Sequence, residues 1–284
     1  MKIMISGTSG FLGGAILERL SEEYTIKSIS IRDDNLKDVD SEILDFKPDV
    51  FIHCGGKSGN SFKDTSNSSQ FDNVEVGIKL LKTLSKFDNL YFIGFGSFAE
   101  YGVKSIVTKE SHTEEPNSYY GLSKKRFKDL SRDYCVVNNF KWLWVRPCYI
   151  YGEGDVSSRL IPKVVDACKN NEDLVLDSCN SIVDYLHVDD FSEAIYELIK
   201  NKCSGVFNVC SGEQYKIRDV VEQIQLISPN PIDIKFDSSK DRINSCTNFV
   251  CGDNTKLKKQ TSWSVKLDLS KGLSIYFKNN KKIL

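Results

Sequence analysis

Residues 2–13 read KIMISGTSGFLG, so that an apolar run leads directly into three glycines spaced three apart. The apolar run predicts a strand and the residues after Gly10 predict a helix, with Gly7, Gly10 and Gly13 at the turn between them. Glycines suit such a turn because a Cβ would block either the tight bend or the approach of a phosphate. Backbone N–H groups at the start of the helix can then hold a pyrophosphate. The spacing GxxGxxG differs from the common fingerprint GxGxxG, and a plain strand-turn-helix is the alternative, but we favour a nucleotide site.

The residues after the next expected strand bear on which dinucleotide such a site would take. Ser30, Arg32 and Asp33 lie at the end of a strand expected over residues 25–31. An NAD site usually places a carboxylate here against the ribose 2′-hydroxyl. A small hydroxyl residue followed by an arginine suits a 2′-phosphate better. We therefore expect NADP(H) to be preferred, with NAD(H) possible through Asp33, and with a solvated Arg32 as the structural alternative.

Short β-branched runs alternate with amphipathic segments over the first 150 residues. This alternation predicts an α/β fold, a doubly wound parallel sheet covered by helices on both faces. Beyond Gly152 the pattern loosens, and we expect the stretch 182–209 to return to the main sheet. The expected domains are a dinucleotide-binding domain of residues 1–152 plus about 182–210, and a smaller α/β C-terminal substrate lobe of about 153–181 plus 211–284. The segments are strands at 2–6, 25–31, 49–54, 90–94, 142–146, 174–176, 205–209 and 232–236, and helical segments at 15–20, 74–84, 118–137, 160–169, 189–200 and 217–227.

Composition excludes several classes of function. The chain has 284 residues and a formal net charge of −1, so it offers no field to attract nucleic acid or anionic lipid. It contains no run of about 18 apolar residues, which argues against a membrane span, and no signal-like start. The nine cysteines are odd in number and scattered, as in a reduced cytoplasmic protein. Three lone histidines, with no CxxC or HExxH, predict no metal site.

A tyrosine and a lysine are the candidate catalytic residues for a dinucleotide bound at the glycine turn. Tyr120 and Lys124 are four residues apart, so they lie on one face of the expected helix. A free tyrosine has a pKa of about 10, and a neighbouring cation makes its proton easier to donate. Ser97 follows an expected strand end and can share a carbonyl oxygen with Tyr120. Tyr119 is a competing candidate, but its spacing of five from Lys124 turns it off that face, and a solvated helix face is the structural alternative.

These residues together resemble the NAD-dependent epimerase/dehydratase family of extended short-chain dehydrogenases/reductases, which remodel sugars on nucleotide diphosphates. The resemblance implies a Rossmann-type fold, with Tyr120 and Lys124 as the active-site pair and Ser97 in the family's Ser/Thr-x-x-x-Tyr-Gly segment. It also implies a homodimer, through the helices that begin near Asn73 and Ser118. Matching segments are 52–56 (IHCGG), 73–77 (NVEVG), 97–102 (SFAEYG), 146–152 (RPCYIYG), 184–190 (DYLHVDD) and 207–212 (FNVCSG). The cofactor-binding positions expected from the turn, the second strand and these segments are Gly7, Ser9, Gly10, Phe11, Leu12, Gly13, Ser30, Arg32, Cys54, Gly55, Gly56, Asn73, Tyr120, Lys124 and Pro147.

Departures from the family pattern narrow the reaction. Dehydratases have Asp-Glu after the catalytic hydroxyl residue, whereas here Phe98 and Ala99 follow Ser97. The fucose-synthase branch has a cysteine where this chain has Ala99. The resemblance therefore implies reduction of the 4-keto group of a nucleotide-linked 4-keto-6-deoxysugar, with an NAD-dependent 4-epimerase as the alternative. A non-catalytic dinucleotide sensor is a further alternative, against which the retention of Ser97, Tyr120 and Lys124 argues.

Substrate residues are expected beyond the cofactor domain. Arg242 precedes the segment GDNTK at 252–256, which resembles a late signature of relatives that handle GDP-sugars, where the arginine meets the diphosphate. Val183 stands where the family often has a phosphate-binding arginine, so Arg159 or Lys163 could substitute. A surface role for Arg242 is the alternative. The expected substrate-binding residues are thus Ser97, Arg159 and Arg242.

Overall fold

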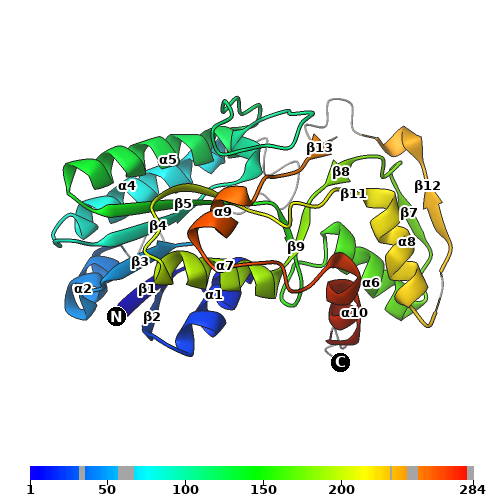
Figure 1. The fold of residues 1–284 in the computed structure, drawn as a ribbon, viewed down its shortest axis with the longest axis horizontal. Helices are drawn as coiled ribbons and strands as arrows, with labels where there is room; N and C mark the ends of the chain where they lie inside the picture. The colour runs from blue at the N-terminus through cyan, green and yellow to red at the C-terminus, as the bar shows by residue number, and fades with distance from the viewer. Residues whose placement is uncertain (32–35, 57–66, 231, 242–248, 280–284) are drawn as a thin grey trace.

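The computed structural model describes residues 1–31, 36–56, 67–230, 232–241 and 249–279. Within these residues the chain forms a large parallel sheet with helices on both faces, followed by a smaller lobe of short strands and helices (Figure 1). The expected fold class, a doubly wound α/β sheet with a smaller C-terminal lobe, is confirmed. None of the described helices has both the length and the apolar character needed to cross a bilayer.

The main sheet has six strands in the order β10-β5-β4-β3-β1-β2, and every neighbouring pair is parallel. In register, Ser6 lies opposite His53, His53 opposite Gly94, and Gly94 opposite Trp144. The carboxyl ends of the central strands therefore meet at one edge, where ligands bind in open α/β sheets. The strands are β1 (Lys2–Ser6), β2 (Thr25–Ile29), β3 (Val50–His53), β4 (Tyr91–Phe95), β5 (Lys141–Pro147) and β10 (Gly205–Val209).

Alternating side chains of the strands form a core on each face of the sheet. Ile3 and Ile5 pack with Ile16 of α1 (Phe11–Ser21) and Phe191 of α7 (Val188–Lys200). On the other face, Met4 packs in the core that contains residues of α2 (Leu36–Phe46), α4 (Asp72–Leu84) and α5 (Tyr119–Val137). Figure 1 shows α1 and α7 on one side of the sheet and α4 and α5 on the other. This period-two burial is what a sheet covered on both faces requires.

The smaller lobe has a hydrophobic core of its own, to which α6 (Leu160–Asn170), α8 (Ile217–Ile227) and α10 (Leu269–Asn279) contribute. Three small sheets, β11-β8-β13, β12-β7 and β6-β9, complete it and its junction with the main sheet. The described residues also form α9 (Thr255–Gln260) and the 3₁₀ turns η2 (Ser68–Phe71), η3 (Phe98–Glu100) and η4 (Ser238–Lys240). The short strands are β6 (Tyr149–Tyr151), β7 (Leu174–Leu176), β8 (Ile182–Val183), β9 (Tyr185–His187), β11 (Tyr215–Lys216), β12 (Ile234–Phe236) and β13 (Phe249–Val250).

The stretch 182–209 divides between the two parts. Its last strand, β10, lies at the edge of the main sheet beside β5, as expected. Its first strand, β8, instead pairs with β11 and β13 in the smaller lobe. Val183 lies opposite Tyr215 of β11, and Ile182 lies opposite Phe249 of β13. The expectation that the whole stretch returns to the main sheet is therefore wrong for β8, and it is also wrong for β9, which pairs with β6 in a separate two-stranded sheet. We propose the domain boundaries given above, except that β8 belongs to the smaller lobe.

Candidate active site

The turn between β1 and α1 has no room for side chains at two of its glycines. Gly7 has φ +80°, and a Cβ there would lie 2.7 Å from the backbone nitrogen of Gly55. A Cβ on Gly13 would lie 2.2 Å from the carbonyl oxygen of Gly7. Gly10 caps α1 without a side-chain hydrogen bond, and the first turn of the helix carries no acidic residue. The open backbone N–H groups and the positive end of the helix dipole therefore fit a pyrophosphate.

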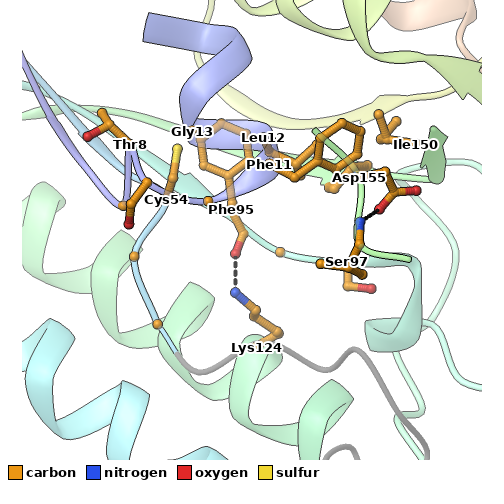
Figure 2. A pocket seen from close by; sticks show the side chains of 18 of the residues that line it. Thr8, Phe11, Leu12, Gly13, Cys54, Phe95, Ser97, Lys124, Ile150 and Asp155 are labelled. Atoms are coloured by element: carbon orange, nitrogen blue, oxygen red, sulfur yellow. Dashed lines mark hydrogen bonds between the residues drawn. The ribbon is translucent and has the colours of Figure 1, made fainter. Parts of the chain in front are cut away.

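A cavity of about 830 Å³ runs from this turn to the first turn of α5. This volume falls within the range of small-molecule and cofactor sites. The walls come from the carboxyl ends of β1, β2, β3, β4 and β5, from the start of α5 and from the loop before α6. Figure 2 shows Phe11, Phe95 and Lys124 around this cavity, with Ser97 beyond the end of β4.

Most of the residues expected at the site line this one cavity. Asn73 lies beside it, because a Cβ on Gly56 would come 3.1 Å from its Oδ1 atom. Arg32 and Arg242 lie outside the described residues. The expected residues on the cavity wall are Gly7, Ser9, Gly10, Phe11, Leu12, Gly13, Ser30, Cys54, Gly55, Gly56, Ser97, Tyr120, Lys124, Pro147 and Arg159.

Tyr120 and Lys124 come from the start of α5, which Ser118 caps by accepting a hydrogen bond from the backbone N–H of Gly121. The Lys124 ammonium donates a 3.0 Å hydrogen bond to the carbonyl oxygen of Phe95, at the end of β4. Its Nζ atom also lies 5.8 Å from the centre of the Tyr120 ring. Figure 2 shows the hydrogen bond from Lys124 to Phe95, and the cation is therefore held at the edge of the sheet near the tyrosine. Tyr119 is 47% exposed and meets Phe71 edge to face, so it points elsewhere.

Ser97 is held by a capping box with Glu100, a residue that was not among the expected site residues. Its Oγ accepts a 3.1 Å hydrogen bond from the backbone N–H of Ala99. Glu100 accepts a 3.0 Å hydrogen bond from the backbone N–H of Ser97 through Oε1. The signal was present, since Ser-x-x-Glu is the pattern of a capping box. Glu100 is fully buried and belongs to the structure around the site, although it does not line the cavity.

His53 supports the loop that faces the glycine turn. Its Nδ1 atom lies 2.8 Å from the Ser6 hydroxyl, which also accepts a hydrogen bond from the backbone N–H of Gly55. Burial, with a smaller effect from the Lys124 charge, lowers the pKa of His53 to about 3. The imidazole is therefore neutral at physiological pH. A hydrogen-bonded neutral ring here fixes the end of β3 against the end of β1.

Arg159 and Asp155 form the wall where the loop before α6 meets the cavity. Nη1 of Arg159 donates to the carbonyl oxygen of Ile150 over 3.2 Å and lies 3.3 Å from Oδ1 of Asp155. Burial raises the pKa of Asp155, and the Arg159 charge opposes that shift. The Arg159 side chain remains 39% exposed and can still contact an anion. Val183, by contrast, is fully buried in the core of the smaller lobe.

Other kinds of site find no support in the part of the chain that the structure describes. Those residues contain no cluster of three or more His, Cys, Asp or Glu side chains placed to hold a metal ion. The described cysteines are free thiols, most of them buried.

Comparison with known proteins identifies the family of the chain. The model of the NAD dependent epimerase/dehydratase family matches residues 3–210. The chain is 26% identical to GDP-6-deoxy-D-talose 4-dehydrogenase of Aggregatibacter actinomycetemcomitans over 248 residues, which cover 83% of each protein. It is 25% identical to GDP-6-deoxy-D-mannose reductase of Pseudomonas aeruginosa over 300 residues, which cover 96% of this chain and 94% of the relative.

A solved structure shares the whole fold. RMD from Pseudomonas aeruginosa complexed with NADPH superposes with a TM-score of 0.86 at 21% identity, covering 98% of this chain and 96% of the other. The family match agrees with the glycine turn, the cavity and the Tyr120–Lys124 pair. The chain belongs to the NAD dependent epimerase/dehydratase family and is an NAD(P)-dependent enzyme of the extended short-chain dehydrogenase/reductase type.

Proposed function

We propose that the protein reduces the 4-keto group of a nucleotide-diphosphate-linked 4-keto-6-deoxysugar, with NADPH as the preferred reductant. The observation that carries the proposal is that Ser97, Tyr120 and Lys124 line one cavity with the glycine turn. A carbonyl that lies between Ser97 and Tyr120 would then be next to the nicotinamide of a cofactor held at that turn.

The chemistry follows from the side chains at that end of the cavity. Bound reduced nicotinamide supplies a hydride, that is, a proton and two electrons, to the carbonyl carbon. As the C=O bond becomes a C–O single bond, negative charge grows on the oxygen. Tyr120 donates its phenolic proton to that oxygen, and Ser97 stabilises the charge through a hydrogen bond. The Lys124 cation stabilises the phenolate that remains until solvent returns the proton.

The cofactor residues follow the walls of the cavity. We assign the pyrophosphate to Gly7, Ser9, Gly10, Phe11, Leu12 and Gly13, and the adenosine ribose to Ser30 with Arg32. We assign the nicotinamide end of the cofactor to Tyr120, Lys124 and Pro147. The remaining proposed cofactor contacts, along the side of the site, are Cys54, Gly55, Gly56 and Asn73. The preference for NADPH rests on Ser30 at the cavity wall, and a relative of the same fold was solved with NADPH.

The substrate assignment rests on the relatives and on one cation. Both named relatives act on GDP-linked 6-deoxysugars, and one of them is a 4-dehydrogenase. We assign Arg159 to the diphosphate of the substrate, because this residue lines the cavity and its side chain is partly exposed. Arg242 is proposed as the second diphosphate contact.

The same three side chains also suit a 4-epimerase, which oxidises and then reduces one carbon with no net use of cofactor. The family description names epimerases, so this is the second candidate. The two activities differ in what they consume. A reductase oxidises one NADPH for each sugar, whereas an epimerase retains its NAD.

The test is a panel of GDP-, CDP-, UDP- and dTDP-linked 4-keto-6-deoxysugars, offered to the purified protein with NADPH and, separately, with NADH. We expect stoichiometric NADPH oxidation with one nucleotide class, slower oxidation of NADH, and none with the Tyr120→Phe variant. If the protein binds NAD but oxidises neither cofactor with any ketosugar, the reductase proposal is contradicted and the epimerase is favoured.

A further inference from the structure

Ser97 is fixed in a way that decides which hydrogen bonds its hydroxyl can make. A serine hydroxyl has one proton to donate and two lone pairs to accept with. One lone pair of Ser97 Oγ is used by the backbone N–H of Ala99, at 3.1 Å. That contact uses none of the donating capacity of the hydroxyl. The proton is therefore available for a carbonyl oxygen in the cavity that Ser97 lines.

Glu100 completes this arrangement from the side away from the cavity. Its Oε1 atom accepts hydrogen bonds from the backbone N–H of Ser97 and from Nε1 of Trp144, each at 3.0 Å. Its Oε2 atom accepts a 2.8 Å hydrogen bond from Nε of Arg146. Gly96 leaves the space for this contact, because a Cβ there would lie 1.9 Å from Oε1 of Glu100. The carboxylate is thus held by three donor groups.

Arg146 is itself anchored on its far side. Its guanidinium binds Glu114 as well as Glu100, and Glu114 also binds Lys128 of α5. Burial pushes the pKa of Glu114 up, but Lys128 and Arg146 outweigh it, so the pKa lies below its usual value. Lys125 and Asp129 extend this network of ion pairs, since Lys125 lies 3.8 Å from Glu114 and Asp129 lies 3.3 Å from Lys128. The Arg146 side chain has no exposed surface, and its guanidinium carbon lies 4.3 Å from the centre of the Tyr101 ring.

Such a buried network contributes little net stability, since apolar residues of similar volume would stabilise the fold about as much. Removing one partner, however, destabilises the fold strongly because it leaves a buried charge unpaired. The value of the network here is geometric. We propose that Glu100, held by Arg146 and Trp144, is a positioning residue that fixes Ser97 as a hydrogen-bond donor to the substrate carbonyl oxygen. This inference rests on the proposed reductase function.

A double-mutant cycle of Glu100 and Ser97 tests this proposal. Glu100→Gln keeps the size of the side chain but presents an amide in place of one carboxylate oxygen, so it cannot satisfy all three donors. We expect kcat for ketosugar reduction to fall about tenfold or more, with KM for NADPH unchanged, because the Ser97 hydrogen bond strengthens only as the oxygen gains charge. In a Ser97→Ala background the same change should lower kcat by no more than about twofold.

Glu114→Gln is the matched control, since it breaks the other ion pair of Arg146 without touching Ser97. We expect it to lower the melting temperature and leave kcat within about twofold. If Glu100→Gln leaves kcat unchanged, or lowers it equally with and without Ser97, the inference is overturned. An equal loss of kcat in Glu114→Gln would overturn it too.

A second variant decides the matter if Glu100→Gln does not fold. Trp144→Phe removes one donor to Glu100 without leaving a buried charge unpaired. It should lower kcat in the presence of Ser97 and not in its absence, and an equal effect in both backgrounds would count against the proposal. If the wild-type protein reduces no ketosugar, the proposed function itself is contradicted. If the wild-type protein is active but its kcat does not change in the Glu100→Gln variant, only the role of Glu100 is contradicted.

Discussion

At the scale of single residues, Tyr120 and Lys124 carry the proposed chemistry. We expect Tyr120→Phe to lower kcat by a factor of about 10² to 10⁴, the usual contribution of a general acid. Binding of NADPH should persist, because the turn that holds the pyrophosphate is intact. Stopped-flow turnover and a fluorescence titration of NADPH measure the two effects. Tyr119→Phe is the control, since Tyr119 points to Phe71, and a similar loss there would refute the assignment of Tyr120.

His53 makes the stability of the fold depend on pH. Its pKa is about 3 in the folded protein, against about 6.5 for a free histidine. As the pH falls below about 6.5 the unfolded chain takes up a proton that the folded protein refuses, so stability present at neutral pH is progressively lost.

The limiting slope from this one residue is about 1.4 kcal/mol of unfolding free energy per pH unit. Urea unfolding between pH 7 and pH 4 measures it, and the His53→Gln variant should give a flatter dependence. Part of the slope should survive, because burial also lowers the pKa of His187. An unchanged slope in the variant would show that His53 does not take up a proton on unfolding.

Tyr120, Lys124 and Ser97 were indicated by sequence features taken together, because a four-residue interval, a glycine-rich turn and a strand end are all visible in a sequence. Glu100, Arg146 and the role of His53 were harder to foresee. Their contacts join residues that are tens of positions apart, such as Glu100 and Arg146, and depend on the register of neighbouring strands.

At the scale of elements, the β1–α1 turn is the feature most sensitive to a single methyl group. We expect Gly13→Ala to weaken NADPH binding at least about tenfold, because its Cβ would lie 2.2 Å from the carbonyl oxygen of Gly7 and displace the turn. Gly14→Ala, where the nearest atom is the Thr8 carbonyl oxygen at 3.3 Å, should bind NADPH nearly as well as the wild type. Calorimetric titration compares the two, and equal affinities would mean that the turn does not shape the pyrophosphate site.

Most long elements were predictable and most short ones were not, although the three-residue strands β7 and β12 fall within expected segments and the helix α10 does not. The strands of the main sheet and helices such as α4, α5 and α8 match expected segments to within a few residues. Strands β6, β8, β9, β11 and β13 have only two or three residues each, so they carry no periodic pattern. Pairing with distant strands defines them. The helix α2 is rich in acidic and polar residues, and it too was absent from the expected segments.

At the scale of the whole molecule, the family resemblance implies a homodimer formed through α4 and α5, which pack against each other on one side of the sheet (Figure 1). We expect sedimentation equilibrium to give twice the chain mass. Leu122 of α5 is 43% exposed, so Leu122→Glu should shift the protein towards monomer with little change in its melting temperature. Wild-type protein that sediments as a monomer would contradict this prediction.

The most direct test of the proposed reduction follows a single hydride. The purified protein is given NADPH that carries deuterium at the transferable position of nicotinamide C4, together with the ketosugar that it accepts, and the product is analysed by NMR and mass spectrometry. We predict one deuterium on C4 of each sugar and one NADP⁺ formed per sugar. Interconversion of two sugars without incorporation of deuterium, by protein that carries bound NAD, would contradict the proposed reduction and establish the epimerase.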